Sequence, residues 1–157
     1  MIIPDVNLLL YATITGFPQH QRAHAWWERT INSSTQVGLT SPALFAFLRL
    51  STNARILEAP MAVNDAVGHV RDWLAQPNVQ LLLPGPRHLD IAFELLEQVG
   101  TAGNLTTDVQ LAAYAIEQQA ELHSNDTDFS RFSDLTWINP LRESAARASN
   151  DAAREIP

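Results

Sequence analysis

Short strand-like runs alternate with helical stretches along most of the chain, and this alternation is the feature that most limits its fold. The runs at residues 1–4, 37–40, 79–83, 121–124 and 135–138 are apolar or β-favouring, whereas the stretches between them carry apolar residues at helical spacing. Strands that alternate with helices form a parallel sheet with both faces covered. The sequence therefore predicts an α/β fold with helices on both sides of a central sheet.

The predicted helices have recognisable start and stop signals. They are expected at residues 6–13, 19–31, 43–52, 62–75, 87–99 and 105–119. Ser41-Pro42 is predicted to be an N-cap followed by proline in the first helical turn, and Gly100 is predicted to end the helix that precedes it. The length of the chain suits one domain, predicted over residues 1–141, and the polar, Ala-rich residues 142–157 are predicted to form a frayed helix or a disordered tail.

Three aspartates follow short apolar or β-favouring runs, at places where strands are expected to end. Asp5, Asp108 and Asp126 each precede a helix-like stretch. The carboxyl ends of parallel strands meet at one edge of the sheet, which is the usual crevice for ligands. Carboxylates gathered there repel one another, and a hard divalent cation is the simplest neutraliser. Each aspartate alone also suits a helix N-cap, so capping and metal binding are both open interpretations.

The segments around these aspartates form an ordered series of motifs. They are residues 5–12 (DVNLLLYA), 103–108 (GNLTTD) with 111–115 (LAAYA), 124–129 (SNDTDF) and 137–141 (WINPL). In this order and spacing the motifs resemble the PIN-domain ribonucleases, and most closely the VapC-type toxins of bacterial toxin–antitoxin pairs. The resemblance implies a three-layer α/β/α domain with a central parallel sheet of about four or five strands.

The resemblance also implies a metal-dependent active site. Asp5, Asp108 and Asp126 are then catalytic metal ligands, and Asp128 is a further ligand or an orienting group. The implied cofactor is Mg²⁺, with Mn²⁺ as a substitute, because a bound ion can activate water and polarise a phosphodiester. The implied reaction is endonucleolytic hydrolysis of structured RNA, with tRNA-like loops as targets because their unstacked bases can reach a recessed edge.

Two groups of polar residues are candidates for supporting roles. Asn7 and Thr107 adjoin the acids and are expected to hold them by hydrogen bonds. The second group follows the apolar helix at 43–52 and consists of Arg49, Thr52, Asn53 and Arg55. This group either contacts RNA phosphate or offsets the charge of the acids; alternatively it is a solvated helix end with arginine near the C-terminal dipole.

One helix departs from the family pattern. The family supplies a further acid, usually glutamate, from the helix after the second strand, whereas residues 41–50 (SPALFAFLRL) contain none. The expected position falls near Ala46 or Phe47. Candidate substitutes are Glu58, Asp90 and Glu94. The departure keeps open a degenerate PIN domain that binds RNA or a protein without cleaving; a DNA flap nuclease is a third interpretation, although the chain lacks length for DNA-clamping elements.

Charge and composition limit the remaining function classes. The net charge of −7 argues against a general nucleic-acid binder with a broad basic face. The absence of cysteine excludes disulfides and thiolate metal sites. No apolar stretch approaches the roughly 20 residues that cross a bilayer, so a cytoplasmic location without membrane contact is expected. The resemblance implies a cognate VapB-type antitoxin as partner and a homodimer.

Overall fold

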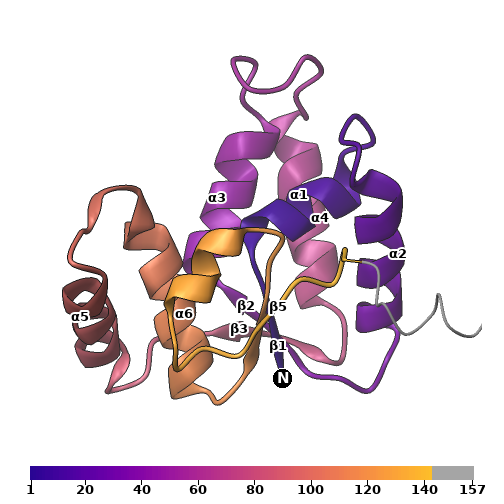
Figure 1. Cartoon of the computed structure of the whole chain (residues 1–157). Coiled ribbons are helices and arrows are strands. Elements are labelled where there is room, and N and C mark those ends of the chain that lie inside the picture. Colours follow the sequence, from indigo (N-terminus) through magenta and orange to yellow (C-terminus); the bar gives the residue numbers. More distant parts are fainter. Residues whose placement is uncertain (143–157) are drawn as a thin grey trace, which may run out of the picture.

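The computed structural model describes residues 1–142, so the predicted tail lies outside the described residues except for Arg142. The strands are β1 (Ile2–Pro4), β2 (Val37–Thr40), β3 (Val79–Leu82), β4 (Glu121–His123) and β5 (Trp137–Ile138). The helices are α1 (Val6–Thr13), α2 (His20–Ile31), α3 (Ser41–Ser51), α4 (Val63–Leu74), α5 (His88–Val99) and α6 (Thr106–Glu117), with short 3-10 turns η1 (Gly103–Leu105) and η2 (Thr127–Arg131). The strands form one sheet in the order β3-β2-β1-β4-β5, and every pairing is parallel (Figure 1).

The centre of this sheet contains the point where the strand order reverses. From β1 the chain adds β2 and β3 on one side, and later adds β4 and β5 on the other. Strands β1 and β4 are therefore neighbours, with Ile3 opposite Leu122 and Pro4 opposite His123. In open α/β sheets the crevice at the carboxyl ends of two such strands is the usual ligand site.

The predicted element types are confirmed, with two local corrections. Helix α3 starts at Ser41, and its N-cap is Thr40 rather than Ser41, because the Thr40 hydroxyl accepts from the Ala43 amide at 3.4 Å. Asp108 does not follow a strand: it lies in the first turn of α6, directly after η1. Gly103 has a positive φ of 35° and starts that turn, so the short segment before Asp108 curls instead of extending.

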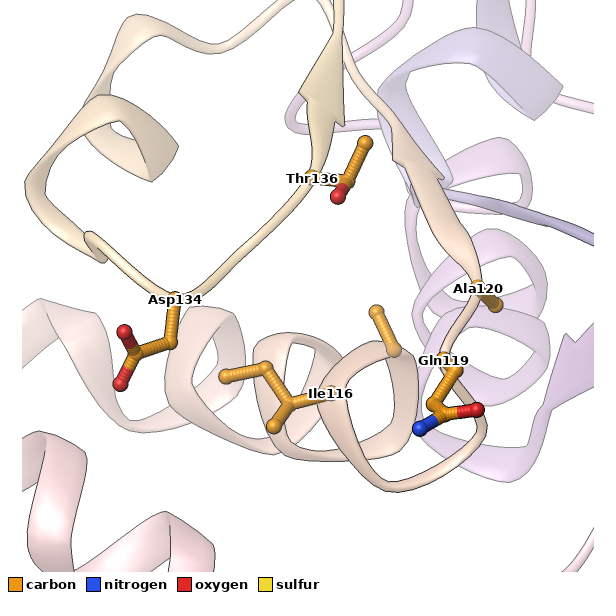
Figure 2. A pocket seen from close by; sticks show the side chains of 6 residues that line it. Ile116, Gln119, Ala120, Asp134 and Thr136 are labelled. Carbon is orange, nitrogen blue, oxygen red and sulfur yellow. The ribbon is translucent and has the colours of Figure 1, made fainter.

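The amino edge of the sheet, opposite the carboxyl ends of β1 and β4, holds a small cavity. It has a volume of about 310 Å³ and is lined by side chains from the end of α6, the start of β4 and the turn before β5, including Gln119, Asp134 and Thr136 (Figure 2). Gln119 adopts a left-handed φ of 51° as the chain leaves α6. None of the predicted site aspartates lines this cavity.

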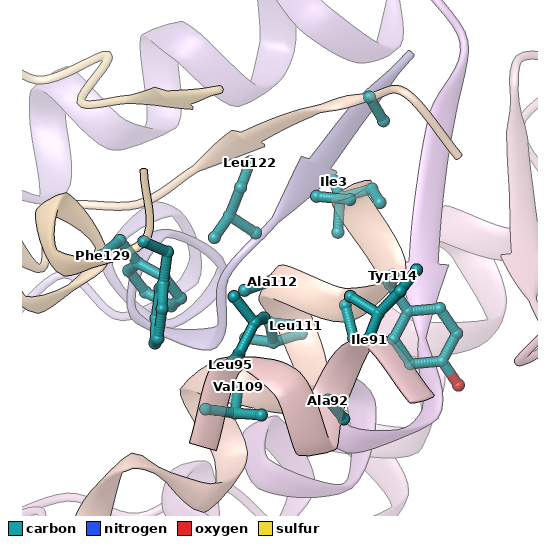
Figure 3. Packing of buried hydrophobic residues seen from close by; sticks show 14 of the residues in the cluster. Ile3, Ile91, Ala92, Leu95, Val109, Leu111, Ala112, Tyr114, Leu122 and Phe129 are labelled. Atoms are coloured by element: carbon teal, nitrogen blue, oxygen red, sulfur yellow. The ribbon is translucent and has the colours of Figure 1, made fainter. Parts of the chain in front are cut away.

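Helices cover both faces of the sheet, and each face has its own apolar cluster. On one face Ile3 and Leu122 pack with residues of α5 and α6 and with Phe129 of η2, all buried (Figure 3). On the other face Val37 and Leu39 pack with side chains from α1, α2, α3 and α4. This arrangement confirms the predicted three-layer α/β/α fold. No helix in the described residues has the length and apolar character needed to cross a membrane.

Candidate active site

Asp5 is the most enclosed acid of the structure and lies directly after β1. Its side chain is buried, and Oδ1 accepts from the Val6 amide at 2.6 Å, which caps α1. Oδ2 accepts from Asn7 Nδ2 at 2.7 Å and from Ser124 Oγ at 2.6 Å. Capping therefore fixes one oxygen of Asp5, and the hydrogen bonds from Asn7 and Ser124 fix the other, so the carboxylate has a single orientation.

Ser124, at the end of β4, joins the acids from the two central strands, and the sequence interpretation did not identify it. Its fully buried Oγ accepts from Asn7 Nδ2 and from the Asp126 amide, both at 3.0 Å. Because two N–H groups point at this oxygen, its own proton is left for Asp5 Oδ2. The available signal was a hydroxyl two residues before a strand-end aspartate, a spacing that suits a local side-chain turn.

Asp126 is the N-cap of η2, just beyond β4, and Asp128 lies in the first turn of η2. Asp126 is exposed and its Oδ1 accepts from the Asp128 amide at 2.9 Å, which caps η2. Asp128 instead pairs with Arg131 at 3.2 Å, on the surface. The fully buried Phe129 ties this turn to the core. Asp126 thus keeps one oxygen free for a cation, whereas Asp128 already has a positive partner.

Asp108 and Tyr11 complete the surroundings of the site. Asp108 projects from the first turn of α6, is half-buried, and makes no side-chain hydrogen bond or ion pair within residues 1–142. Tyr11, on α1, was not identified from the sequence. Burial raises the pKa of the Tyr11 phenol, and the charges of Asp5 and Asp126 raise it further, so the hydroxyl lies within range of those charges.

The electrostatics of the site are those of acids without a nearby base. Burial raises the pKa of Asp5 to about 6 against the lowering effect of its hydrogen bonds, and the charge of Asp126 adds to the rise. Burial is also the main cause that raises the pKa of Asp108 to about 6, and the charges of Asp5, Asp126 and Asp128 raise it further. The three elements therefore bring acids close enough to repel one another, and no positive side chain is among the main influences on Asp5 or Asp108.

The donor set fits a hard divalent cation. All of the candidate ligands are carboxylate oxygens, which Mg²⁺ and Mn²⁺ prefer. The free Asp126 oxygen and the unbonded Asp108 carboxylate are available, and a cation would offset the charges of Asp5, Asp126 and Asp128 that add to the rise in the pKa of Asp108. Within the described part of the chain, no three acidic or histidine side chains already stand together as a complete metal shell.

Helix α3 lacks the acid that the family supplies, and the packing of Phe47 and Ala46 distinguishes the two positions where that acid was expected. Phe47 is fully buried and its ring meets Trp73 edge-on at 4.8 Å between centroids, so position 47 faces the core. Ala46 is only partly buried, on a helix that contacts both α1 and α6. Of the two expected positions, Phe47 faces the core, which leaves Ala46 as the candidate. The suggested substitutes Glu58, Asp90 and Glu94 are all exposed.

The remaining predicted residues lie in less enclosed places. Thr107 is exposed, and its hydroxyl makes no hydrogen bond to any described residue. At the end of α3, the Thr52 hydroxyl donates to the Leu48 carbonyl at 2.8 Å and Asn53 Oδ1 accepts from the Arg55 amide at 2.8 Å. Arg49 and Arg55 are exposed, and neither forms a salt bridge within residues 1–142. Within this group of four residues, the two guanidinium groups are left free for an anion.

Comparisons with known proteins agree with this arrangement. The PIN domain model matches residues 2–135. Ribonuclease VapC33 of Mycobacterium tuberculosis H37Rv is 68% identical over 143 residues, covering 91% of this chain and 100% of that protein. Ribonuclease VapC37 of the same strain is 39% identical over 140 residues, covering 89% of this chain and 97% of that protein.

Solved structures share the fold at lower identity. VapC20 of Mycobacterium tuberculosis, a sarcin-ricin loop cleaving toxin, superposes with a TM-score of 0.66 at 16% identity, covering 87% of this chain and 98% of that one. VapBC2 from Rickettsia felis, bound to a promoter DNA fragment, has a TM-score of 0.64 at 20% identity, covering 88% of this chain and 98% of the other. The chain therefore belongs to the PIN-domain family and, within it, to the VapC group.

Proposed function

We propose that this chain is the ribonuclease toxin of a VapBC-type toxin–antitoxin pair and that it cleaves RNA with Mg²⁺ or Mn²⁺ held by Asp5, Asp108 and Asp126. The observation that carries the proposal is the uncompensated acidic site at the switch point, where the charges of Asp5 and Asp126 act on Asp108. The 68% identity to Ribonuclease VapC33 supports the class of activity.

The residues of the chain supply position and charge for this reaction. A bound divalent ion would activate water and stabilise charge on the scissile phosphate. Asp5 has a fixed orientation because Ser124 and Asn7 both donate to Oδ2. Asp126 and Asp108 present free oxygens from the other two elements. Asp128, paired with Arg131, adds negative charge at the rim of the site rather than a fourth ligand.

The substrate we propose is a loop of structured RNA such as that of a tRNA. Unpaired nucleotides can enter a recessed edge that a regular duplex cannot. Arg49 and Arg55, on and just beyond α3, are exposed and are assigned to contacts with RNA phosphates. Thr52 and Asn53 support these arginines by fixing the helix end and the loop after it, because their side chains bond to that backbone.

The proposed protein partners are a VapB-type antitoxin and a second copy of the chain, in the cytoplasm. An acidic site suits inhibition by a basic side chain that competes with the cation. For the homodimer, the candidate surface is the outer side of α5, where Leu89 and Phe93 are 62% and 55% exposed one helical turn apart. Light scattering tests the dimer: Phe93→Glu is expected to halve the mass, and an unchanged mass would exclude this surface.

Cleavage assays separate the enzyme from a degenerate domain. Labelled total tRNA is incubated with the purified chain in EDTA, Mg²⁺ or Mn²⁺, beside Asp108→Asn and the matched control Asp134→Asn. We expect metal-dependent cleavage by the chain and by the control, and a loss of at least about a hundredfold in Asp108→Asn. Binding of RNA without any metal-dependent product would favour the degenerate PIN domain, which the missing acid at Ala46 keeps as the second candidate.

A further inference from the structure

The loop that carries Ser124 and Asp126 is held from the other side by the C-terminal segment Trp137–Leu141. The Ser124 amide donates to the Ile138 carbonyl at 3.0 Å, which is the last rung of the β4–β5 ladder. The Trp137 indole Nε1 donates to the Ser124 carbonyl at 3.1 Å. Both backbone groups of Ser124 are thus fixed by one short segment, although that segment is itself remote from the acids in sequence.

Asn139 extends this contact to the next residue of the loop. Its Nδ2 donates to Asn125 Oδ1 at 3.1 Å, and its Oδ1 accepts from the Leu141 amide at 3.0 Å. The local bond to Leu141 fixes the amide plane and so aims Nδ2 at Asn125. Serine could make the local bond but could not span the distance to Asn125.

The chain of bonds continues from this segment to the most buried acid. The Asn125 amide donates to Asn7 Oδ1 at 3.3 Å, and Asn7 Nδ2 donates to Asp5. At the other end, the buried Leu141 anchors the segment, and its carbonyl accepts from Arg22 Nη1 of α2 at 3.1 Å. Asn139 therefore lies between this buried anchor and the site loop.

We propose that Asn139 and Trp137 are positioning residues: through Asn125 and the Ser124 backbone they fix the loop that presents Asp126 opposite Asp5. This inference rests on the proposed metal-dependent function, but the order of the loop is measurable without it. Neither residue touches the substrate in this role. Loss of either side chain is expected to weaken metal binding while the affinity for RNA stays the same. Removing a residue that orients metal ligands typically changes metal affinity about 10- to 100-fold.

The first test is amide hydrogen exchange followed by NMR on the full, metal-free chain. The variants are Asn139→Ser, which keeps the local bond to Leu141, and Trp137→Phe, which keeps an aromatic ring but removes the indole donor. We expect exchange of the Asn125 and Asp126 amides to accelerate at least about tenfold, because these bonds open locally once the loop loses its support. Wild-type exchange at both amides in both variants would overturn the proposal.

Asn78→Ala is the matched control. Asn78 Nδ2 donates to the carbonyls of Thr30, Ser33 and Thr35 at 2.8–3.2 Å, at the amino edge of the sheet. This variant removes equally well-formed amide bonds and lowers global stability without touching the site loop. If it accelerates exchange at Asn125 and Asp126 as much as Asn139→Ser does, the effect is global softening and the positioning role is wrong.

The second test measures the consequence for the metal. Mn²⁺ is titrated into each protein and followed by the rise in melting temperature and, separately, by RNA cleavage. For Asn139→Ser we expect the half-saturating Mn²⁺ concentration to rise about tenfold, with KM for RNA unchanged. A change in KM alone would contradict the role. If the wild-type chain binds Mn²⁺ and orders the loop but cleaves no RNA, the proposed function fails while the positioning role stands.

Discussion

Replacing Asp108 by asparagine should make the metal-free protein more stable while it disables the site. The pKa of Asp108 lies at about 6 instead of 3.8, so the folded state disfavours the ionised carboxylate. At about 1.4 kcal/mol per pKa unit, a fully dry group would destabilise the fold by about 3 kcal/mol. Asp108 is only half-buried, so solvent screening reduces this figure to about 1.5 kcal/mol.

Loss of the favourable interaction between Asp108 and the N-terminus of α6 offsets about 0.5 kcal/mol of that gain. The net expectation for Asp108→Asn in EDTA at pH 7.5 is about 1 kcal/mol of added stability, a rise in melting temperature of about 2–4 °C. Differential scanning fluorimetry measures the shift, and urea unfolding gives the free energy. Asp134→Asn, at an exposed position, is the control and should stay within about 0.5 kcal/mol of wild type.

The sign of the pH dependence follows from the raised pKa. In the wild-type protein the contribution of Asp108 to stability is fully present below pH 3.8 and is lost as the pH rises through about 6. The advantage of Asp108→Asn should therefore be largest above pH 6.5 and vanish near pH 4. Saturating Mn²⁺ should reverse the order, because metal at 100 times its Kd stabilises the wild type by about 2.7 kcal/mol. A variant that is less stable than wild type in EDTA at pH 7.5 would refute the reasoning.

Three further substitutions test separate parts of the structure. The Glu117 carboxylate caps the start of α5 by accepting from the Gly85 and Arg87 amides, and Gly85→Ala would push a methyl group into it. Urea unfolding should show a loss of about 1–2 kcal/mol in the free energy of unfolding, and wild-type stability would contradict this cap. Gln119→Gly relieves a left-handed backbone and should add about 1 kcal/mol in the same assay; a loss would show that the side chain stabilises this turn. Ala46→Glu should lower the half-saturating Mn²⁺ concentration several-fold, about tenfold at most, in a thermal-shift titration; unchanged binding would place the vacant acid position elsewhere.

The fold was predictable because its signals are local. Within residues 1–142, the alternation of apolar runs with helical spacing identified each strand and each α-helix to within a few residues, and a parallel sheet follows from that alternation. Asp108 shows the limit: a short run before it looked β-favouring, but it has no neighbouring strand to pair with and curls into η1 instead. The N-cap of α3 moved by one residue because the Thr40 and Ser41 hydroxyls are equally suited and only the backbone geometry chooses.

The surroundings of the site were less predictable because they depend on long-range contacts. In the sequence, Ser124 looks like an ordinary serine at the end of a strand. Its hydroxyl contacts Asp5, 119 residues away in sequence, only because β1 and β4 are neighbours in the sheet. Likewise, the choice between Ala46 and Phe47 needed the packing of the Phe47 ring on Trp73. The motif WINPL was visible in the sequence, but the bond from Asn139 to Asn125 depends on how β5 and the site loop fold together.

The most direct test of the account is the anomalous scattering of Mn²⁺ in crystals of the wild-type chain soaked at saturating metal. We predict a manganese peak at the carboxyl ends of β1 and β4, with oxygens of Asp5, Asp108 and Asp126 at about 2.0–2.3 Å. The same soak of Asp108→Asn should give a weaker peak or none. A saturated wild-type crystal whose manganese lies away from these three carboxylates would contradict the central claim.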